Sequence, residues 1–234
     1  MAWIEHDYTD SDALVMAVTE ALQAHCAAAL QQRGHALLSL AGGRTPLPIY
    51  RALAAASLDW SKVTAMPGDE RCVPHAHPAS NVAALREAFA AADGIGIESL
   101  TSADGNPQAS LAHARSMLAT HADAFDAVVL GMGEDAHTAS LFPGAEALPE
   151  ALAEDARDDA FLLVPNPLPP EAPFPRITLG AARLLRAHSL HLIVTGARKR
   201  EVLRAAQAAH DPLRAPVSAL LHAPGAVVHV HWSP

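Results

Sequence analysis

The segment Ala-Leu-Leu-Ser-Leu (residues 36–40) is followed closely by Gly-Gly-Arg-Thr-Pro (residues 42–46). The apolar segment predicts a short buried strand, and the two glycines predict a tight loop after it. Pro46 favours the first turn of a helix, because its fixed φ angle already suits helical geometry. This stretch therefore predicts a strand, a loop and a helix in succession, which is the repeating unit of α/β folds.

The same succession recurs along the chain. Residues 11–33 carry apolar side chains at helical spacing, with Asp10 or Ser11 as the cap at the start and Gly34 at the end. We predict further strands at 63–66, 98–100, 126–130, 161–164, 190–195 and 226–232, and further helices at 80–89, 108–119, after Thr178, and at 198–210. The alternation predicts an α/β fold: a mostly parallel, Rossmann-like sheet with helices on both faces, forming a single domain over residues 1–234. The proline-dense connection at 165–175 is either a domain boundary or an active-site loop.

Composition narrows the class of protein. The chain has 234 residues, of which 50% are hydrophobic and 18% charged, so it has enough apolar material for a packed core and is not a disordered chain. Its formal net charge of −9 disfavours broad electrostatic binding to nucleic acid or to an anionic membrane. An anionic small molecule would need a local cluster of Arg or Lys.

The cysteines and the first residues bear on the compartment. Cys26 and Cys72 are the two cysteines, and they form no CxxC pair, which excludes a disulfide framework and favours a reducing compartment. The first residues lack a basic region followed by an apolar one, and no run approaches the roughly 18 apolar residues that span a bilayer. We therefore expect a cytoplasmic protein with no membrane partner.

Ligands of such sheets bind beyond the carboxyl ends of the strands, so residues that directly follow strands are the candidates. Gly42 and Gly43 let backbone N–H groups approach an anion, and the following helix adds a favourable partial charge. Arg44 adds a positive charge and Thr45 a hydroxyl group. An ordinary strand-to-helix turn explains the glycines equally well.

A second charged group, Asp69-Glu70-Arg71, follows the strand predicted at 63–66. Three consecutive charges in a sparsely charged chain usually form a solvated turn, but this position favours a functional role. Ser80 and Asn81 behind them are expected to cap a helix.

Residues 131–144 read Gly-Met-Gly-Glu-Asp-Ala-His-Thr-Ala-Ser-Leu-Phe-Pro-Gly after another strand. They match the dinucleotide pattern G-x-G-x-x-A formally. We reject that interpretation, because Pro143 ends any helix too early and no acidic residue follows the next strand to hold a ribose. What remains is His137 with Asp135 two residues before it, where the carboxylate can hold the imidazole. Most lone histidines are structural, but histidine also suits acid–base chemistry near neutral pH.

Arg176 and Lys199 each lie beside a predicted strand. Lys199 and Arg200 open a helix, where a positive charge is unfavourable unless an anion lies nearby. A plain surface charge is the alternative. His75-x-His77 and His229-x-His231 each put two imidazoles on one strand face, but no cysteine or carboxylate completes a ligand set, so we expect no metal site.

Taken together and in this order, these motifs resemble the 6-phosphogluconolactonase family, within the glucosamine-6-phosphate deaminase/isomerase-like superfamily. The resemblance extends from about residue 36 to residue 200. Its most specific part is the block His-Thr-Ala-Ser-Leu-Phe-Pro at residues 137–143.

The resemblance implies hydrolysis of 6-phospho-D-glucono-1,5-lactone to 6-phospho-D-gluconate in the oxidative pentose phosphate pathway, without metal or cofactor. It implies that His137 is the general base, helped by Asp135, and that Arg71 binds the acid end of the sugar or the developing oxyanion. Asp69 would bind sugar hydroxyls or order Arg71. The remaining substrate contacts, chiefly to the 6-phosphate, would come from Gly42, Gly43, Arg44, Thr45, Arg176 and Lys199. The only partner expected is the sugar-phosphate lactone, with no nucleic acid, and the assembly is a monomer or a homodimer.

The chain departs from the family pattern at two positions. Ala136 stands where the family usually has glycine; alanine costs roughly 1 kcal/mol if this position needs a positive φ, and we expect ordinary helical space instead. Arg44 replaces a more usual serine. The sequence also argues against two alternative functions. An amino-sugar phosphate deaminase/isomerase requires Asn-Glu-Pro where residues 141–143 are Leu-Phe-Pro, and a sugar-phosphate sensor usually carries a DNA-binding segment.

Overall fold

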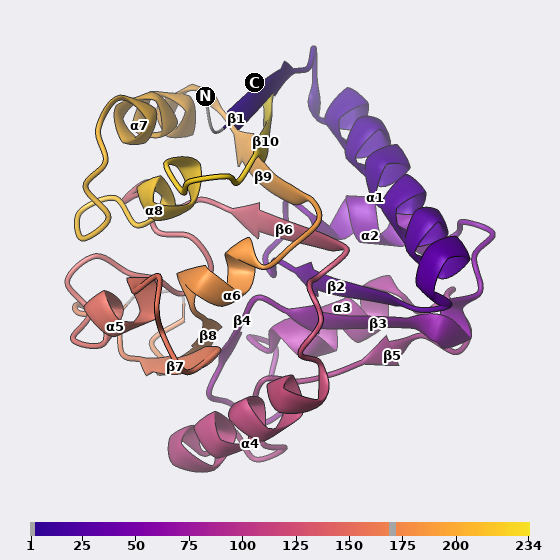
Figure 1. Ribbon diagram of the computed structural model, residues 1–234, viewed down its shortest axis with the longest axis horizontal. Coiled ribbons are helices and arrows are strands. Elements are labelled where there is room, and N and C mark those ends of the chain that lie inside the picture. Colours follow the sequence, from indigo (N-terminus) through magenta and orange to yellow (C-terminus); the bar gives the residue numbers. More distant parts are fainter. Residues whose placement is uncertain (1–2, 169–171) are drawn as a thin grey trace.

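The computed structural model describes residues 3–168 and 172–234, and these are built around a seven-stranded sheet (Figure 1). All neighbouring strands of this sheet pair in parallel. In spatial order the strands are β1 (Trp3–Asp7), β10 (Val228–Ser233), β9 (Leu190–Thr195), β6 (Ala127–Gly131), β2 (Ala36–Leu40), β3 (Val63–Pro67) and β5 (Gly96–Ile97). The predicted α/β fold in a single domain is therefore confirmed.

Helices cover both faces of the sheet because successive strand residues point to opposite sides. Leu38 and Leu40 of β2 pack into one core cluster and Leu37 packs into the other. The first cluster is closed by α1 (Ser11–Arg33), α2 (Leu47–Ala54) and α3 (Asn81–Ala88), and a 3-10 helix, η1 (Trp60–Lys62), lies at its edge. The second cluster is closed by α4 (Pro107–Thr120), α5 (Leu148–Leu152), α6 (Ala181–Leu185), α7 (Ala197–Ala208) and α8 (Val217–Leu221).

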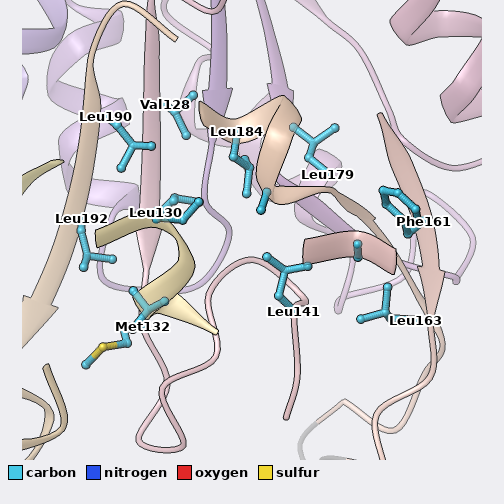
Figure 2. Close-up of a cluster of buried hydrophobic side chains, with 14 of the residues drawn as sticks. Val128, Leu130, Met132, Leu141, Phe161, Leu163, Leu179, Leu184, Leu190 and Leu192 are labelled. Carbon is cyan, nitrogen blue, oxygen red and sulfur yellow. The ribbon is translucent and has the colours of Figure 1, made fainter. Parts of the chain in front are cut away.

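Figure 2 shows the second cluster, in which Val128 and Leu130 of β6 lie beside Leu190 and Leu192 of β9. Leu184 of α6 packs over them, and all five side chains are at most 4% exposed. Each buried leucine of this kind contributes roughly 1.5–3 kcal/mol relative to an exposed one. These contacts fix the carboxyl ends of β6 and β9 relative to each other. The starting points of the loops that follow the two strands are therefore fixed as well.

Helix α1 begins and ends where the sequence predicts. Asp10 accepts a hydrogen bond from the Ala13 N–H at 2.8 Å, and Gly34 takes a φ of 77° while its N–H donates to the Leu30 carbonyl. By length and mean hydropathy alone α1 is apolar enough to cross a membrane, a test that the core helices of globular proteins also pass. One of its faces is buried against the sheet and α2 through Leu14, Val18, Leu22, Cys26 and Ala29.

The sequence missed the two edge strands of the main sheet. Strand β1 was not predicted, because its side chains are mostly exposed and give no apolar alternation. The strand predicted at 98–100 is wrong: the edge strand β5 comes two residues earlier and is two residues long. Edge strands bury little side-chain surface, so their sequences show only a weak apolar pattern from which a strand could be predicted.

A second sheet was not predicted either. It contains three antiparallel strands, in the order β4 (Asp69–Arg71), β8 (Arg176–Leu179) and β7 (Ala160–Leu163). Only β7 was expected as a strand. The small sheet carries the charged residues 69–71 and Arg176, so their positions come from strand pairing rather than from loops.

Histidines cluster where β1, β10 and β9 meet under α1. His6 is the register partner of His231, and His191 is that of His229, so their rings share one face of the sheet. Neighbouring rings on the strands stack with centroids 4.8–5.4 Å apart, and the ring of His25 of α1 lies tilted against that of His191 at 5.5 Å. A hydrogen-bond chain runs from Ser189 through His191 and His231 to the hydroxyl group of Tyr8, with distances of 2.9, 3.0 and 2.8 Å. We call His6, His25, His191, His229 and His231 the histidine cluster.

Candidate active site

A cleft of about 350 Å³ opens beyond the carboxyl ends of β2, β6 and β9. This is where parallel sheets bind ligands. Nine of the ten site residues expected from the sequence line it: Gly42, Gly43, Arg44, Thr45, Asp69, Arg71, His137, Arg176 and Lys199. The tenth, Asp135, lines an adjoining hollow together with His137. The sequence-based site is thus brought together from both sheets.

The Gly42–Thr45 loop connects β2 to α2 and forms one wall of the cleft. A Cβ atom on Gly42 would collide with the carboxamide of Asn81, so only glycine fits there. Gly43 has a φ of 89°, which glycine adopts without strain. Arg44 and Thr45 are exposed at the cleft rim. The loop presents backbone rather than side-chain bulk to a ligand, as anion-binding loops do.

Arg71 and Arg176 form the opposite wall. They are Cα partners across the antiparallel β4–β8 pair, and both line the cleft. Residues directly opposite on a sheet point to the same face, so two like charges are held together. An Arg176 Nη1 lies 3.9 Å from a carboxylate oxygen of Asp69, while its Nε and Nη2 donate to the carbonyls of Phe174 and Ala172. The lining of the whole cleft has four cationic side chains against the single carboxylate of Asp69, within an acidic protein.

In the described part of the chain Asp69 and Arg71 are held by different partners. The Asp69 carboxylate accepts a hydrogen bond from the Ser140 hydroxyl and approaches Arg176. Arg71 is held instead by the Ala79 carbonyl, to which its Nη1 donates. Asp69 therefore links the loop after β6 to the small sheet.

Glu70 is fully buried and organises this wall from behind. Its carboxylate accepts hydrogen bonds from the backbone N–H groups of Arg71, Asn81 and Val82 and from the Ser80 hydroxyl, at 2.7–3.1 Å. Burial raises the pKa of Glu70, and the backbone hydrogen bonds oppose that rise. The carboxylate caps α3 and fixes the backbone on both sides of Arg71, a role that the charge pattern alone did not reveal.

His137 and Asp135 form a pair beside the cleft: His137 lines it, and both residues line the adjoining hollow. The imidazole Nδ1 lies 2.5 Å from Asp135 Oδ1. Since a carboxylate accepts, Nδ1 carries the hydrogen and Nε2 keeps its lone pair. Gly133 makes room for the pair, because an added Cβ would collide with both side chains. The resulting group is a histidine oriented by a carboxylate, which suits a general base.

Asp135 is ionised in this pair. Its side chain is 52% exposed, and partial burial raises its pKa, but the hydrogen bond and the positive charge available on His137 outweigh burial and leave the pKa below the usual value. An ionised Asp135 stabilises positive charge on the imidazole.

Ala136, between these two residues, has a φ of 61°. The expectation of ordinary helical space is therefore wrong. The left-handed conformation costs a non-glycine residue about 1–2 kcal/mol. It is held by two backbone hydrogen bonds, from the Ala136 N–H to the Gly133 carbonyl at 3.1 Å and from the Val217 N–H to the Ala136 carbonyl at 3.0 Å. The tight turn that results points His137 into the cleft.

Lys199 reaches the cleft from α7. Its neighbours are paired elsewhere, Arg198 with Glu201 and Arg200 with Asp7 and the Trp232 ring. Within residues 3–168 and 172–234 no carboxylate pairs with Lys199. Its charge is thus available to an anion in the cleft.

Three contributors were missed as site residues. Asn81 lines the cleft and donates from Nδ2 to the Asp69 carbonyl at 2.8 Å, although the sequence suggested only a helix cap. Ser140 holds Asp69, and the Phe142 ring stacks on His137. Only the spatial neighbours of these three residues identify them.

The adjoining hollow bears on the proline-dense connection at 165–175. Pro165, Asn166, Pro167, Leu168 and Ala172 line the hollow beside His137. This supports the active-site loop over the domain boundary. Residues 169–171 of the connection lie outside the described residues.

Metal ligands do not gather in the described ranges: no group of three or more His, Cys, Asp or Glu side chains there has the geometry of a metal site. His75 and His77 lie in a turn, not on a strand face as expected, and His75 Nε2 is bonded to Thr101. His229 and His231 do share a face, inside the histidine cluster.

Comparison with known proteins agrees with this geometry. The family model described as "Glucosamine-6-phosphate isomerases/6-phosphogluconolactonase" matches residues 9–232. A 6-phosphogluconolactonase of Rhizobium meliloti is 36% identical over 234 residues, covering 98% of both chains. One from Pseudomonas aeruginosa is 38% identical, covering 88% of this chain and 84% of the relative.

The crystal structure of a 6-phosphogluconolactonase from Shewanella baltica superposes with a TM-score of 0.92 at 30% identity, covering 99% of this chain and 97% of the other. The agreement extends over both sheets, since nearly all of the chain is aligned. The chain therefore belongs to the glucosamine-6-phosphate isomerase/6-phosphogluconolactonase family.

Proposed function

We propose that this chain is a 6-phosphogluconolactonase, hydrolysing 6-phospho-D-glucono-1,5-lactone to 6-phospho-D-gluconate in the oxidative pentose phosphate pathway. The curated relatives and the solved structure named above support the activity. The observation that carries the mechanism is the His137–Asp135 pair, whose second imidazole nitrogen is left as a lone pair in a cleft lined by cationic side chains.

The substrate's phosphate is held at a distance from the reacting carbon. Gly42, Gly43, Arg44 and Thr45 offer backbone N–H groups, a hydroxyl and a positive charge, and Lys199 adds its ammonium group. Anchoring this dianion fixes the lactone carbonyl over His137, and such positioning converts binding energy into rate. We also assign Arg176 to the binding of the phosphate. Arg176 lies beside Arg71 and Asp69 in the cleft.

Hydrolysis needs no covalent enzyme intermediate, because a lactone carbonyl is already electrophilic. His137 Nε2 takes a proton from water as the water oxygen attacks C1, and the C1–O bond to the ring oxygen then breaks. The imidazolium returns the proton to that ring oxygen, which leaves as the hydroxyl group of the open acid. General acid–base catalysis of this kind typically contributes about 10²–10⁴ in rate.

Two charges help the transition state. Arg71, in the cleft wall, stabilises the negative charge that develops on the carbonyl oxygen. Asp135 stabilises the positive charge on His137 through the 2.5 Å contact to Nδ1. Asp69, bound to Ser140, accepts hydrogen bonds from sugar hydroxyls with its remaining lone pairs.

The isomerase branch of the family is the rival. Its reaction needs a further carboxylate for ring opening and proton transfer, at the place where this chain has Leu141, Phe142 and Pro143. Phe142 puts an uncharged ring against His137 there. A phenyl ring has no ionisable proton and cannot replace a carboxylate in proton transfer, so lactone hydrolysis is the better fit.

We also propose that the protein works in the cytoplasm, with the sugar-phosphate lactone as its partner and without cofactor, metal, nucleic acid or membrane. It acts as a monomer or homodimer of one domain, residues 1–234.

Acid release from freshly generated 6-phosphogluconolactone tests the function, measured against the spontaneous hydrolysis of the same sample. We expect the protein to exceed the spontaneous rate, His137→Asn to return it to that baseline, and 6-phosphogluconate affinity to change by less than about threefold in the variant. His35→Asn, an exposed histidine outside the cleft, is the matched control.

Three outcomes would count against the proposal. Wild-type protein no faster than the baseline excludes the lactonase, and a fully active His137→Asn variant excludes the mechanism. Turnover of glucosamine 6-phosphate would favour the isomerase, whereas phosphogluconate binding without any turnover would favour a sensor.

A further inference from the structure

Phe142 contacts two residues of the site at once. Its ring centroid is 4.3 Å from that of His137, with the two planes 29° apart. The guanidinium carbon of Arg176 lies 5.3 Å from the same phenyl centroid. The ring is 7% exposed and lines the hollow that adjoins the cleft, beside His137 and Arg176.

The backbone that carries this ring is firmly tied. The Leu141 N–H donates to the Thr138 carbonyl at 3.0 Å, and the Thr138 hydroxyl donates to the Gly131 carbonyl at 2.9 Å. The Ser140 N–H donates to the Thr178 hydroxyl on β8 at 3.2 Å. The segment is thus fastened to β6 on one side and to the small sheet on the other, and the phenyl ring is a fixed surface.

His137 depends on such a surface. Its contact with Asp135 holds one edge of the imidazole, but the Asp135 side chain is 52% exposed and lies on the same tight turn. One hydrogen bond at Nδ1 leaves the ring free to tilt about that bond. A flat neighbour against the imidazole face removes this freedom, so Asp135 and Phe142 together fix the direction of Nε2.

The phenyl face also lies against the ring on which positive charge develops during the proposed reaction. The negative face of a phenyl ring attracts a nearby cation. In the proposed reaction His137 becomes an imidazolium only after water has attacked. The attraction therefore strengthens in the step where charge develops, which is where an interaction accelerates a reaction.

Resting on the proposed lactonase function, we propose that Phe142 is a positioning residue, whose ring holds the His137 imidazole in its reactive orientation. It touches neither water nor lactone and acts through His137. Arg176 does not need the ring in the same way, because its Nε and Nη2 are held by the Phe174 and Ala172 carbonyls. Removing the ring therefore disturbs the base and leaves ligand binding in place.

Steady-state kinetics of Phe142→Leu, Phe142→Tyr and wild type test this role. We expect the leucine variant to lose about 10- to 100-fold in kcat with KM within about twofold, since a small misplacement of a catalytic group costs this much. The tyrosine variant keeps the ring and restores most of kcat. Phe161→Leu is the matched control: Phe161 is also 7% exposed in the same core cluster but lies outside the cleft and the hollow.

NMR of the histidine ring protons gives a readout that does not need turnover. Protons over a phenyl face resonate upfield, so the His137 signals, assigned from His137→Asn, should lie upfield in wild type and move downfield in Phe142→Leu. They should stay in place in Phe161→Leu. Should the leucine variant not fold, a wild-type His137 signal at the position of a freely exposed imidazole overturns the proposal by itself.

The outcomes separate the two claims. An active wild type whose Phe142→Leu variant matches Phe161→Leu in kcat, or loses only KM, overturns the role of Phe142 and leaves the lactonase standing. An inactive wild type overturns the lactonase, and the NMR comparison then decides whether Phe142 orients His137.

Discussion

Arg71 and Arg176 are directly opposed on two antiparallel strands, and both side chains line one cleft. Like charges in this arrangement destabilise a sheet. Burial lowers the pKa of Arg176 most, Asp69 counteracts this, and the charge of Arg71 lowers it further. The protein thus holds two guanidinium groups in an arrangement that an anion between them would relieve.

Removing one of these charges should cost ligand affinity. We expect 6-phosphogluconate at about 100 times its Kd to stabilise wild type by roughly 2.7 kcal/mol. Arg71→Met keeps the apolar stem but should bind at least about tenfold more weakly, and so gain about 1.4 kcal/mol less at the same concentration. Urea denaturation with and without ligand measures both. Arg51→Met, an exposed arginine paired with Glu87, is the control and should behave as wild type. Equal ligand stabilisation in Arg71→Met would remove Arg71 from the binding site.

Asp135 should matter for rate rather than for binding. Asp135→Asn removes the charge that stabilises a protonated His137, and an amide can present N–H where Nδ1 needs an acceptor. We expect kcat to fall by about 10- to 100-fold with KM nearly unchanged. The neighbouring Glu134 is exposed and lines neither the cleft nor the adjoining hollow, so Glu134→Gln should keep full activity. Equal kcat values in the two variants would contradict the pairing.

The left-handed backbone at Ala136 makes a prediction about stability. Glycine would relieve about 1–2 kcal/mol of strain. However, the Ala136 methyl group is buried, and losing it costs about 0.8 kcal/mol of folding free energy. Glycine also makes the unfolded chain more flexible, which costs about 0.4–1 kcal/mol more. These effects nearly cancel, so Ala136→Gly should change the free energy of unfolding by less than about 1 kcal/mol, measured by urea denaturation. Ala136→Val adds a branched side chain to the same φ and should destabilise by about 2 kcal/mol or more. A neutral valine variant would show that the φ of 61° is wrong.

The histidine cluster should make the fold sensitive to acid. Burial, followed by the neighbouring histidines, lowers the pKa of His191 from 6.5 to about 2 and that of His231 to about 3. Between these values and 6.5 the unfolded chain binds more protons than the folded one. Stability therefore rises with pH in this window and is lost as the pH falls below about 6.5.

Each of these two histidines should contribute a slope of up to about 1.4 kcal/mol per pH unit. His191→Gln removes one of them, so the decline of unfolding free energy between pH 6.5 and pH 5 should be shallower in this variant, whatever its stability at pH 7. His35→Gln, at an exposed position, should keep the wild-type slope. An unchanged slope in His191→Gln would mean that folding does not lower the pKa of His191.

The parts of the fold that the sequence predicted are those whose pattern is local. The buried strands β2, β6 and β9 are apolar runs, and α1 carries both of its caps in its own sequence. Strands β4 and β8 have no such pattern. Their charged or short segments become strands only by pairing across more than a hundred residues, as Arg71 does with Arg176.

The site residues that the sequence predicted are likewise those that belong to local motifs. Gly42, Gly43 and His137 were found because they directly follow strands in recognisable motifs. Asn81 and Phe142 act through neighbours that only the folded chain supplies, namely Gly42 and His137. The φ of Ala136 is held partly by a hydrogen bond from the N–H of Val217, which lies far along the chain, and the residue type alanine gives no sign of a left-handed turn.

The position of β10 between β1 and β9 has a consequence for how the chain matures. On the ribosome, β1 emerges first and must wait for a partner that follows all the other strands, with 223 residues separating His6 from His229. Before β10 forms, part of the surface against which α1 packs is missing. Part of the apolar face of α1 is then exposed to chaperones or to aggregation. Pairing between strands so far apart in sequence forms slowly, because the chain loses conformational entropy before the new contacts stabilise it. We therefore expect the completion of this edge to be the late step of folding, after the cleft-forming strands have already assembled.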